Sequence, residues 1–207
     1  MDPVSQGVVG AAFAQTAAKR ATLATVAWYG ALGGMAPDLD VLFQSSTDPI
    51  LFLEFHRQFT HSLVFIPLGA LLVFLVLRAI ASRFRFLQGL STGQAYLACL
   101  MGYATHGLLD ACTSYGTQLL WPFSNTRVAW DTMSIVDPLF TLPLVVLVVA
   151  ASRSKRIWLS WIACIWMFSF FALGWLQQER ALQAAHQVAQ IRGHAPLRLS
   201  VKPSFAN

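Results

Sequence analysis

Six apolar stretches alternate with short polar segments along the chain. They cover residues 4–18, 22–36, 62–80, 94–112, 138–151 and 157–176. The third and the sixth each approach the ~20 apolar residues that a helix needs to cross the hydrocarbon core of a membrane. The pattern therefore predicts an all-α, polytopic membrane protein, a bundle of about six helices.

The first two stretches are short and weak, with 15 residues each. A helix of their length reaches only ~22 Å, whereas the hydrocarbon core is ~30 Å thick. We expect residues 4–18 and 22–36 to form a short helical hairpin that turns at Lys19 and Arg20, with outer ends that stop inside the membrane boundary.

The composition changes after residue 176. Residues 177–193 are polar and suit a continuing helix, whereas residues 195–207 contain two prolines and suit a loop or a strand. We expect a transmembrane helical domain over residues 1–176 and a polar C-terminal tail, or the start of an extramembrane domain, over residues 177–207. The N-terminus lacks the basic region and the cleavage site of a signal peptide, so the first helix is expected to be retained.

The composition agrees with a membrane protein, because 56% of residues are hydrophobic, 11% are charged, and the mean hydropathy is +0.57. A net charge of +5 is compatible with nucleic-acid binding, but the cations stand in short clusters between apolar stretches, where they orient helices. Nucleic acid is not an expected partner. The cysteines Cys99, Cys112 and Cys164 form no paired motif, so no disulfide is expected.

Basic and acidic residues occupy opposite connections between the stretches. Three alternate connections contain cations and no acids: Lys19 and Arg20; Arg78, Arg83 and Arg85; Arg153, Lys155 and Arg156. The positive-inside rule places these connections in the cytoplasm. The other connections and adjoining helix ends contain Asp2, Asp38, Asp40, Asp48, Glu54, Asp110, Asp131 and Asp137. With six crossings, both termini and the acids face outward, which in a bacterial inner membrane means the periplasm.

Two polar motifs stand between the second and the third stretch. In the first, Asp38 and Asp40 follow a helix-ending proline two residues apart, which suits oxygen ligands on a turn, although an ordinary polar loop has the same pattern. In the second, His56 and His61 frame the entry into the third stretch. A helix would place these histidines on different faces, whereas a turn would let them approach one ion or two neighbouring ions. Interfacial histidines that only form hydrogen bonds are the alternative.

The third motif lies inside the fourth stretch, where His106 and Asp110 share one helical face. Ionisable side chains at such depth are costly, so the pair either shares one hydrogen bond or forms half of a metal site. The loop that follows contains hydroxyl groups and Arg127, which suit an anion such as phosphate, and aromatic residues that suit the headgroup level. His186 and His194 in the tail are expected to be solvated. All the other candidates fall on one side of the membrane, as a single site requires.

Taken together and in order, four motifs resemble the YdjM/YbcI family of predicted membrane-bound metal-dependent hydrolases over nearly the whole chain. They are the Met-Asp-Pro start, Pro-Asp-Leu-Asp, His-Arg-x-x-Thr-His-Ser, and His-x-x-Leu-Asp followed by Thr-Ser-Tyr-Gly-Thr-Gln-Leu-Leu-Trp-Pro-Phe-Ser. The resemblance implies an inner-membrane protein with a hydrolytic metal site. Its implied ligands are Asp38, Asp40, His56, His61, His106 and Asp110, with Asp2 from the opening motif.

The chain departs from the family at Gln6, where many members have a histidine. An amide therefore replaces one ligand, and the number of ions stays open. Longer relatives also continue into a C-terminal extramembrane domain.

The chemistry that we expect is metal-dependent hydrolysis. One or two divalent ions, zinc or manganese, would lower the pKa of a bound water and make it nucleophilic. Arg57 and Arg127 would bind a substrate anion, and Asp131 or Glu54 would act as general base. A site at the membrane face suits a phosphoester of a lipid or lipid-linked substrate, so membrane lipids are the expected partners.

Other functions fit the residues less well. A membrane di-iron oxygenase needs more histidines than the five present, and an intramembrane metalloprotease needs a His-Glu-x-x-His motif, which the sequence lacks. An ion or proton-coupled transporter would place polar groups across the bilayer, whereas these groups stop at one face. A non-catalytic membrane scaffold with a structural metal remains an alternative.

Overall fold

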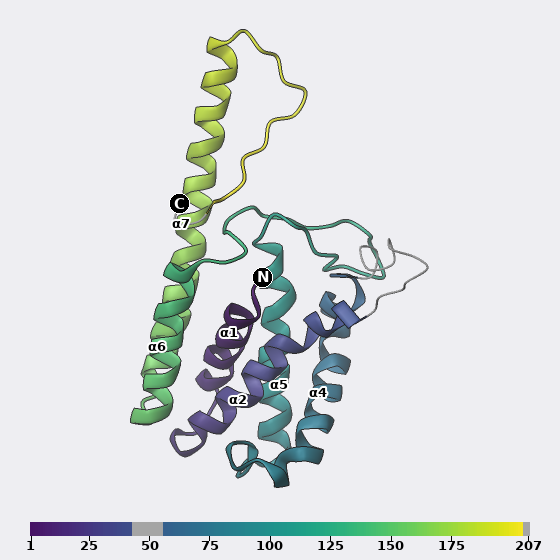
Figure 1. Ribbon diagram of the computed structural model, residues 1–207, viewed down its shortest axis with the longest axis vertical. Coiled ribbons are helices and arrows are strands. Elements are labelled where there is room, and N and C mark those ends of the chain that lie inside the picture. The colour runs from purple at the N-terminus through teal and green to yellow at the C-terminus, as the bar shows by residue number, and fades with distance from the viewer. Residues whose placement is uncertain (43–55, 205–207) are drawn as a thin grey trace.

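A computed structural model of the chain describes residues 1–42 and 56–204 (Figure 1). These residues form six α-helices: α1 (Pro3–Thr16), α2 (Leu23–Met35), α4 (Ile66–Ile80), α5 (Thr92–Ala111), α6 (Pro138–Ser154) and α7 (Trp158–Ile191). Short 3-10 helices include η2 (Ala36–Leu42), η3 (Phe59–His61) and η4 (Leu63–Phe65). The described part of the chain contains no β-strand, so the all-helical prediction is confirmed, with a helix in each apolar stretch.

Side-chain caps fix where several helices begin. The Asp2 carboxylate accepts a hydrogen bond from the backbone N–H of Ser5 at the start of α1, and Asp137 accepts one from Leu139 at the start of α6. Ser91 and Gln94 form a reciprocal capping box at the start of α5. Such caps satisfy N–H groups that have no partner within the helix.

The short hairpin of α1 and α2 lies at the centre of the bundle, packed against α5 (Figure 1). Glycines make this possible: a Cβ atom on Gly102 would overlap the carbonyl oxygen of Gly30, and one on Gly30 would overlap that of Gly10. Small residues let helix backbones approach closely inside a membrane protein. The first two stretches are therefore short helices that other helices cover.

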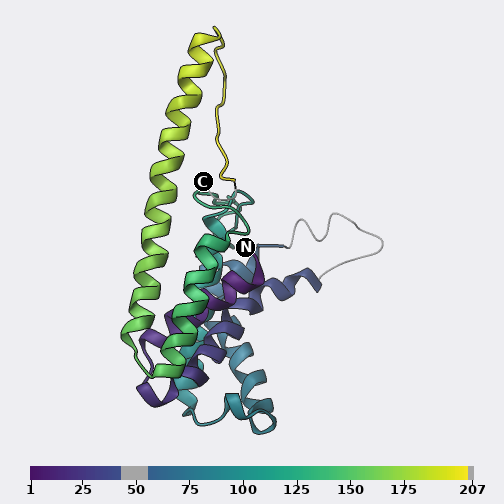
Figure 2. The same cartoon turned by 60° about the vertical axis from the view of Figure 1, so that its left-hand side comes forward.

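Helices α6 and α7 form a second hairpin beside this core (Figure 2). Its turn places Lys155 in the left-handed region, with a φ of 57°. At 1.5 Å per residue, α7 is about 50 Å long, so its polar C-terminal half extends beyond the bundle. Residues 177–191 thus continue the helix as expected, and residues 195–204 form neither helix nor strand. The division into two domains stays a prediction.

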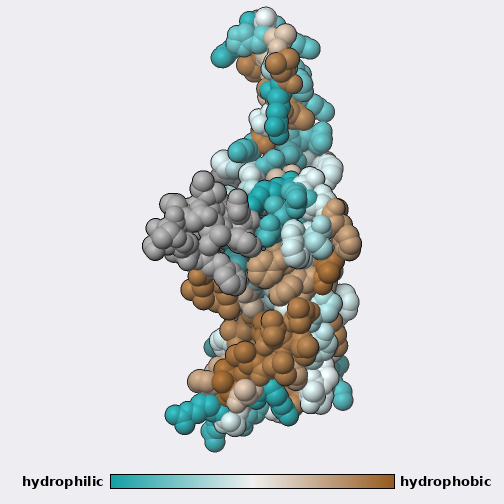
Figure 3. Space-filling model, turned by 90° about the vertical axis from the view of Figure 1, so that its right-hand side faces the viewer, coloured by the Kyte–Doolittle hydropathy of each residue, from teal (hydrophilic) through white to brown (hydrophobic). Residues whose placement is uncertain are grey.

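The molecule has a surface suited to lipid. The segments Leu63–Arg83 and Trp158–Ile191 are long and apolar enough to cross a membrane. Leu68, Leu72 and Val76 on α4 are all more than half exposed. On the face shown in Figure 3, hydrophobic residues gather in the lower half, above a hydrophilic lower end. The number of helices that cross, and their direction, stay predictions.

Candidate metal centre

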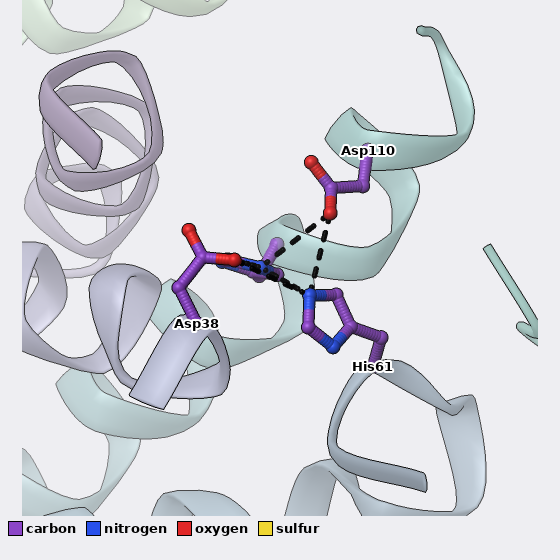
Figure 4. A group of neighbouring side chains, drawn as sticks. Asp38, His61 and Asp110 are labelled. Carbon is purple, nitrogen blue, oxygen red and sulfur yellow. Dashed lines mark hydrogen bonds and ion pairs between the residues drawn. The ribbon is translucent and has the colours of Figure 1, made fainter. Parts of the chain in front are cut away.

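Four side chains meet at one end of the bundle. Asp38 comes from η2 at the end of α2, His61 comes from η3 before α4, and His106 and Asp110 come from the last turns of α5. One ligand atom from each lies within 4.8 Å of the other three (Figure 4). The turns that contain the basic clusters lie at the opposite end (Figure 1). The structure thus brings together four of the seven predicted metal ligands.

The distances within this group suit one ion. The Nε2 atoms of His61 and His106 are 2.8 Å apart. Asp38 Oδ1 lies 3.5 Å from the first and 3.3 Å from the second, and Asp110 Oδ2 lies 3.3 Å and 3.8 Å from them. Ligands held about 2.1 Å from a tetrahedral ion lie about 3.4 Å apart. Two imidazoles and two carboxylates are therefore close to the geometry of a four-coordinate centre.

Three of the four side chains of the group are shielded from solvent. The side chains of His61, His106 and Asp110 are fully buried, whereas that of Asp38 is 21% exposed. Asp110 Oδ2 lies 3.2 Å from Arg57 Nε and 3.3 Å from His61 Nε2, but it accepts no hydrogen bond from any residue that the structure describes. A cation at the centre of the group would give this buried oxygen a direct ligand contact. The donor set fits a divalent metal ion.

Neighbouring oxygens orient both imidazoles. His106 Nδ1 lies within hydrogen-bond distance of the Gly34 carbonyl oxygen, which can only accept, so Nδ1 carries the proton and Nε2 faces the group. His61 Nδ1 lies 2.9 Å from the Thr60 hydroxyl, which donates to Asp40 Oδ2 at 3.0 Å. Metal-binding histidines usually have such a partner on the second ring nitrogen. Both histidines are thus held ready to bind an ion.

Asp40 and His56 lie one layer outside the group. The Asp40 carboxylate accepts hydrogen bonds from Thr60, from the Arg57 backbone N–H at 3.0 Å, and from His56 Nδ1 at 2.8 Å. Burial alone would raise the pKa of Asp40, but the His56 hydrogen bond and the nearby His61 outweigh it and lower the pKa overall. With these partners, both residues position His61 in the structure. Because Asp38 and Asp40 are two residues apart in η2, only the Asp38 carboxylate points into the group.

The guanidinium of Arg57 is buried beside the group. Its Nε atom lies 3.2 Å from Asp110 Oδ2, its Nη1 atom donates to the Thr113 hydroxyl, and its Cζ atom lies 5.0 Å from the centre of the Tyr115 ring. The backbone adopts a φ of 62°, which lets the N–H reach Asp40. Arg57 therefore offsets the charge of Asp110, and its predicted contact with a substrate anion stays a prediction.

Arg127 lies at the rim. Its side chain is exposed and donates to the carbonyl oxygens of Gly116 and His56, so it ties the 113–137 connection to the histidine segment. That connection runs over this end of the bundle and also bonds the backbone of Arg57 through Gln118 (Figure 1). It thereby helps to bury the group.

The remaining predicted site residues stand elsewhere. Asp131 lines a separate cavity of about 410 Å³ together with Arg180 and Lys202. Asp2 caps α1. Glu54 lies outside the residues that the structure describes. The two tail histidines, His186 and His194, are exposed as expected.

The sequence reasoning missed how α1 supports Asp110. Gln6 Nε2 donates to Asp110 Oδ1 at 2.9 Å, and the amino group of Met1 contacts the same oxygen. Gln6 stands where many family members have a histidine, and its amide holds the carboxylate of Asp110. The role of Thr60, whose hydroxyl contacts both Asp40 and His61, could have been inferred from its position next to His61 in the motif.

This fold and site define an all-helical membrane protein with a buried histidine and aspartate group that could hold a metal ion. Residues 1–181 match the family described as YdjM inner membrane protein, and the chain belongs to that family. This range contains every residue of the group.

A relative in Bacillus subtilis (strain 168), the uncharacterized protein YfhP, is 28% identical over 106 residues, which cover 51% of this chain and 30% of that protein. The match thus spans less than a third of the length of this relative. No solved structure matches the chain.

Proposed function

We propose that the protein is a membrane-bound metal-dependent hydrolase that cleaves a phosphoester of a lipid or lipid-linked substrate at the outer face of the inner membrane. The observation that carries this proposal is the largely buried group of two imidazoles and two carboxylates, in which Asp110 Oδ2 accepts no hydrogen bond from any residue that the structure describes. The group lies at one end of a bundle whose basic turns lie at the other end, as an outward-facing site requires.

Three enclosed ligands and one partly open position suit a catalytic centre. His61, His106 and Asp110 would hold the ion, and Asp38 would stand on its accessible side. Zinc suits this set of nitrogen and oxygen donors best, and manganese is the other candidate. When bound, the ion would lower the pKa of a water molecule and polarise a phosphoryl oxygen.

Asp38 is placed to act on the attacking water. Burial alone would raise the pKa of Asp38, but contacts with His106 and His61 outweigh it and lower the pKa well below its usual range. An ionised carboxylate on the open side of the group can accept a hydrogen bond from a water molecule and orient it, although so low a pKa makes it a weak proton acceptor. By position, Asp38 rather than Asp131, which lines the other cavity, would orient the attacking water.

The position of the group beside a membrane-spanning segment favours a lipid substrate. The group lies beside the start of Leu63–Arg83, a segment apolar enough to cross a bilayer. A headgroup phosphate could reach Arg127, which is exposed at the rim, while the lipid tail stays in the bilayer. Binding that holds the phosphate in the reactive position lowers the entropic part of the activation barrier.

A structural metal in a non-catalytic scaffold is the second candidate, because three of the four side chains are fully buried. One experiment separates the two. Detergent-purified protein is analysed for metal content and for phosphate release from phosphatidic acid in mixed micelles, alongside His106→Ala and the control His186→Ala. We expect metal and turnover in the wild type and the control, and neither in His106→Ala. Bound metal without turnover of any phospholipid would favour the scaffold, and metal-free wild type would overturn the site.

A further inference from the structure

An apolar groove of about 550 Å³ lies along the α4 side of the bundle, between α4 and the end of α2. Its walls include Leu32 and Met35 from α2 and Leu72, Val73 and Val76 from α4. Leu72 and Val76 are more than half exposed at its edge, so the groove opens on the apolar surface of Leu63–Arg83. In a membrane this opening faces lipid.

Two residues that line the groove are direct sequence neighbours of the candidate metal centre. Leu39, which lines it, stands between Asp38 and Asp40 in η2. Thr60 also lines it, and the Thr60 hydroxyl contacts both Asp40 and His61. The groove and the centre therefore lie next to each other, separated by Leu39 and Thr60.

The length of the groove matches one lipid tail. It extends from Phe65, at the end of η4, to Leu77 on α4, which is about 18 Å at 1.5 Å per residue. Half of a hydrocarbon core of ~30 Å is about 15 Å, the depth that a tail occupies in one leaflet. A tail that lies in the groove would thus run from the centre toward the middle of the bilayer.

We propose that this groove holds a hydrocarbon tail of the lipid substrate and thereby places the headgroup phosphate at the metal centre. This inference rests on the proposed function and names the part of the substrate that the enzyme recognises. Because lipid tails already surround the protein, filling the groove gains little hydrophobic free energy. The groove acts by position: it fixes the depth and direction of the scissile bond relative to Asp38.

Crosslinking tests occupancy without any need for catalysis. The protein is reconstituted in lipid nanodiscs with phosphatidic acid that has a photoreactive diazirine in its tail, and adducts are located by mass spectrometry. We expect adducts on Leu72, Val73 and Val76, reduced by excess long-chain phosphatidic acid, and few on Leu75, which lies on α4 outside the groove and is 52% exposed. Equal labelling of Leu75 and the groove residues, or a protein helix that copurifies in the groove, would overturn the inference.

A groove-filling variant tests its effect on hydrolysis. Val73→Trp should raise KM for long-chain phosphatidic acid by ~10-fold or more, leave turnover of a short-chain analogue unchanged, and keep the metal. Leu75→Trp is the matched control and should behave as wild type, and Leu72→Trp replaces Val73→Trp if that variant does not fold. Specific labelling without hydrolysis would retain the groove and refute the proposed function. Hydrolysis that is indifferent to tail length and to both groove variants would refute the groove and retain the function.

Discussion

Replacing Thr60 with valine should weaken metal binding although Thr60 is not a ligand. Its hydroxyl accepts from His61 Nδ1 at 2.9 Å and donates to Asp40 Oδ2 at 3.0 Å. Valine has the same shape without the hydroxyl, so Thr60→Val removes both hydrogen bonds. It leaves His61 Nδ1 with only Asp40 Oδ2, 3.4 Å away. The imidazole then loses the contact that sets its proton and its direction.

The expected loss is 10–100-fold in metal affinity, which is the usual effect of removing an outer partner of a ligand histidine and corresponds to about 1.4–2.7 kcal/mol. Competition with a chromophoric chelator in detergent would measure it. Thr105→Val is the matched control, because the Thr105 hydroxyl is also buried but donates to Gly102 within α5. Unchanged affinity in Thr60→Val, or an equal loss in Thr105→Val, would refute the assigned role of Thr60.

Three further outcomes follow from the structure. Burial alone would lower the pKa of His61, but contacts with Asp110 and Asp38 raise it. Protons should therefore compete with the metal at a higher pH than at an unperturbed histidine, and metal retention measured against pH should fall on the acid side. Gly102→Ala should lower the thermal unfolding temperature, because its Cβ would overlap the Gly30 carbonyl at a cost of ~1–3 kcal/mol, whereas Gly93→Ala has open space and should not lower it. Arg127→Gln should raise KM for an anionic lipid and leave the metal content unchanged, and an unchanged KM would remove this residue from the site.

Much of the fold could be predicted because hydrophobic length and polar breaks decide where helices form in a membrane protein. All six apolar stretches contain helices, and α7 continues through its polar half. The central place of α1 and α2 could not be predicted from hydropathy. It depends on backbone contact between Gly10, Gly30 and Gly102, which are far apart in the sequence.

The sequence predicted which residues lie in or near the candidate site better than it predicted what each of them does there. The spacing of His106 and Asp110 on one helix placed both in the group. The sequence could not distinguish Asp38 from Asp40, because only the 3-10 conformation of η2 sends one carboxylate to the group and the other to His56. It likewise left open whether His56 and His61 lie on a helix or a turn. In the structure His61 belongs to the group, whereas His56 contacts Asp40 outside it.

We expect one metal ion in this group, held by His61, His106 and Asp110, with Asp38 on its open side. X-ray absorption at the metal edge of purified, metal-loaded protein tests it most directly. We expect one ion per chain with only nitrogen and oxygen neighbours at about 2.0–2.2 Å, including two imidazoles, and loss of one imidazole signal in His61→Ala. Sulfur ligands, or a spectrum that His61→Ala and His106→Ala leave unchanged, would contradict it.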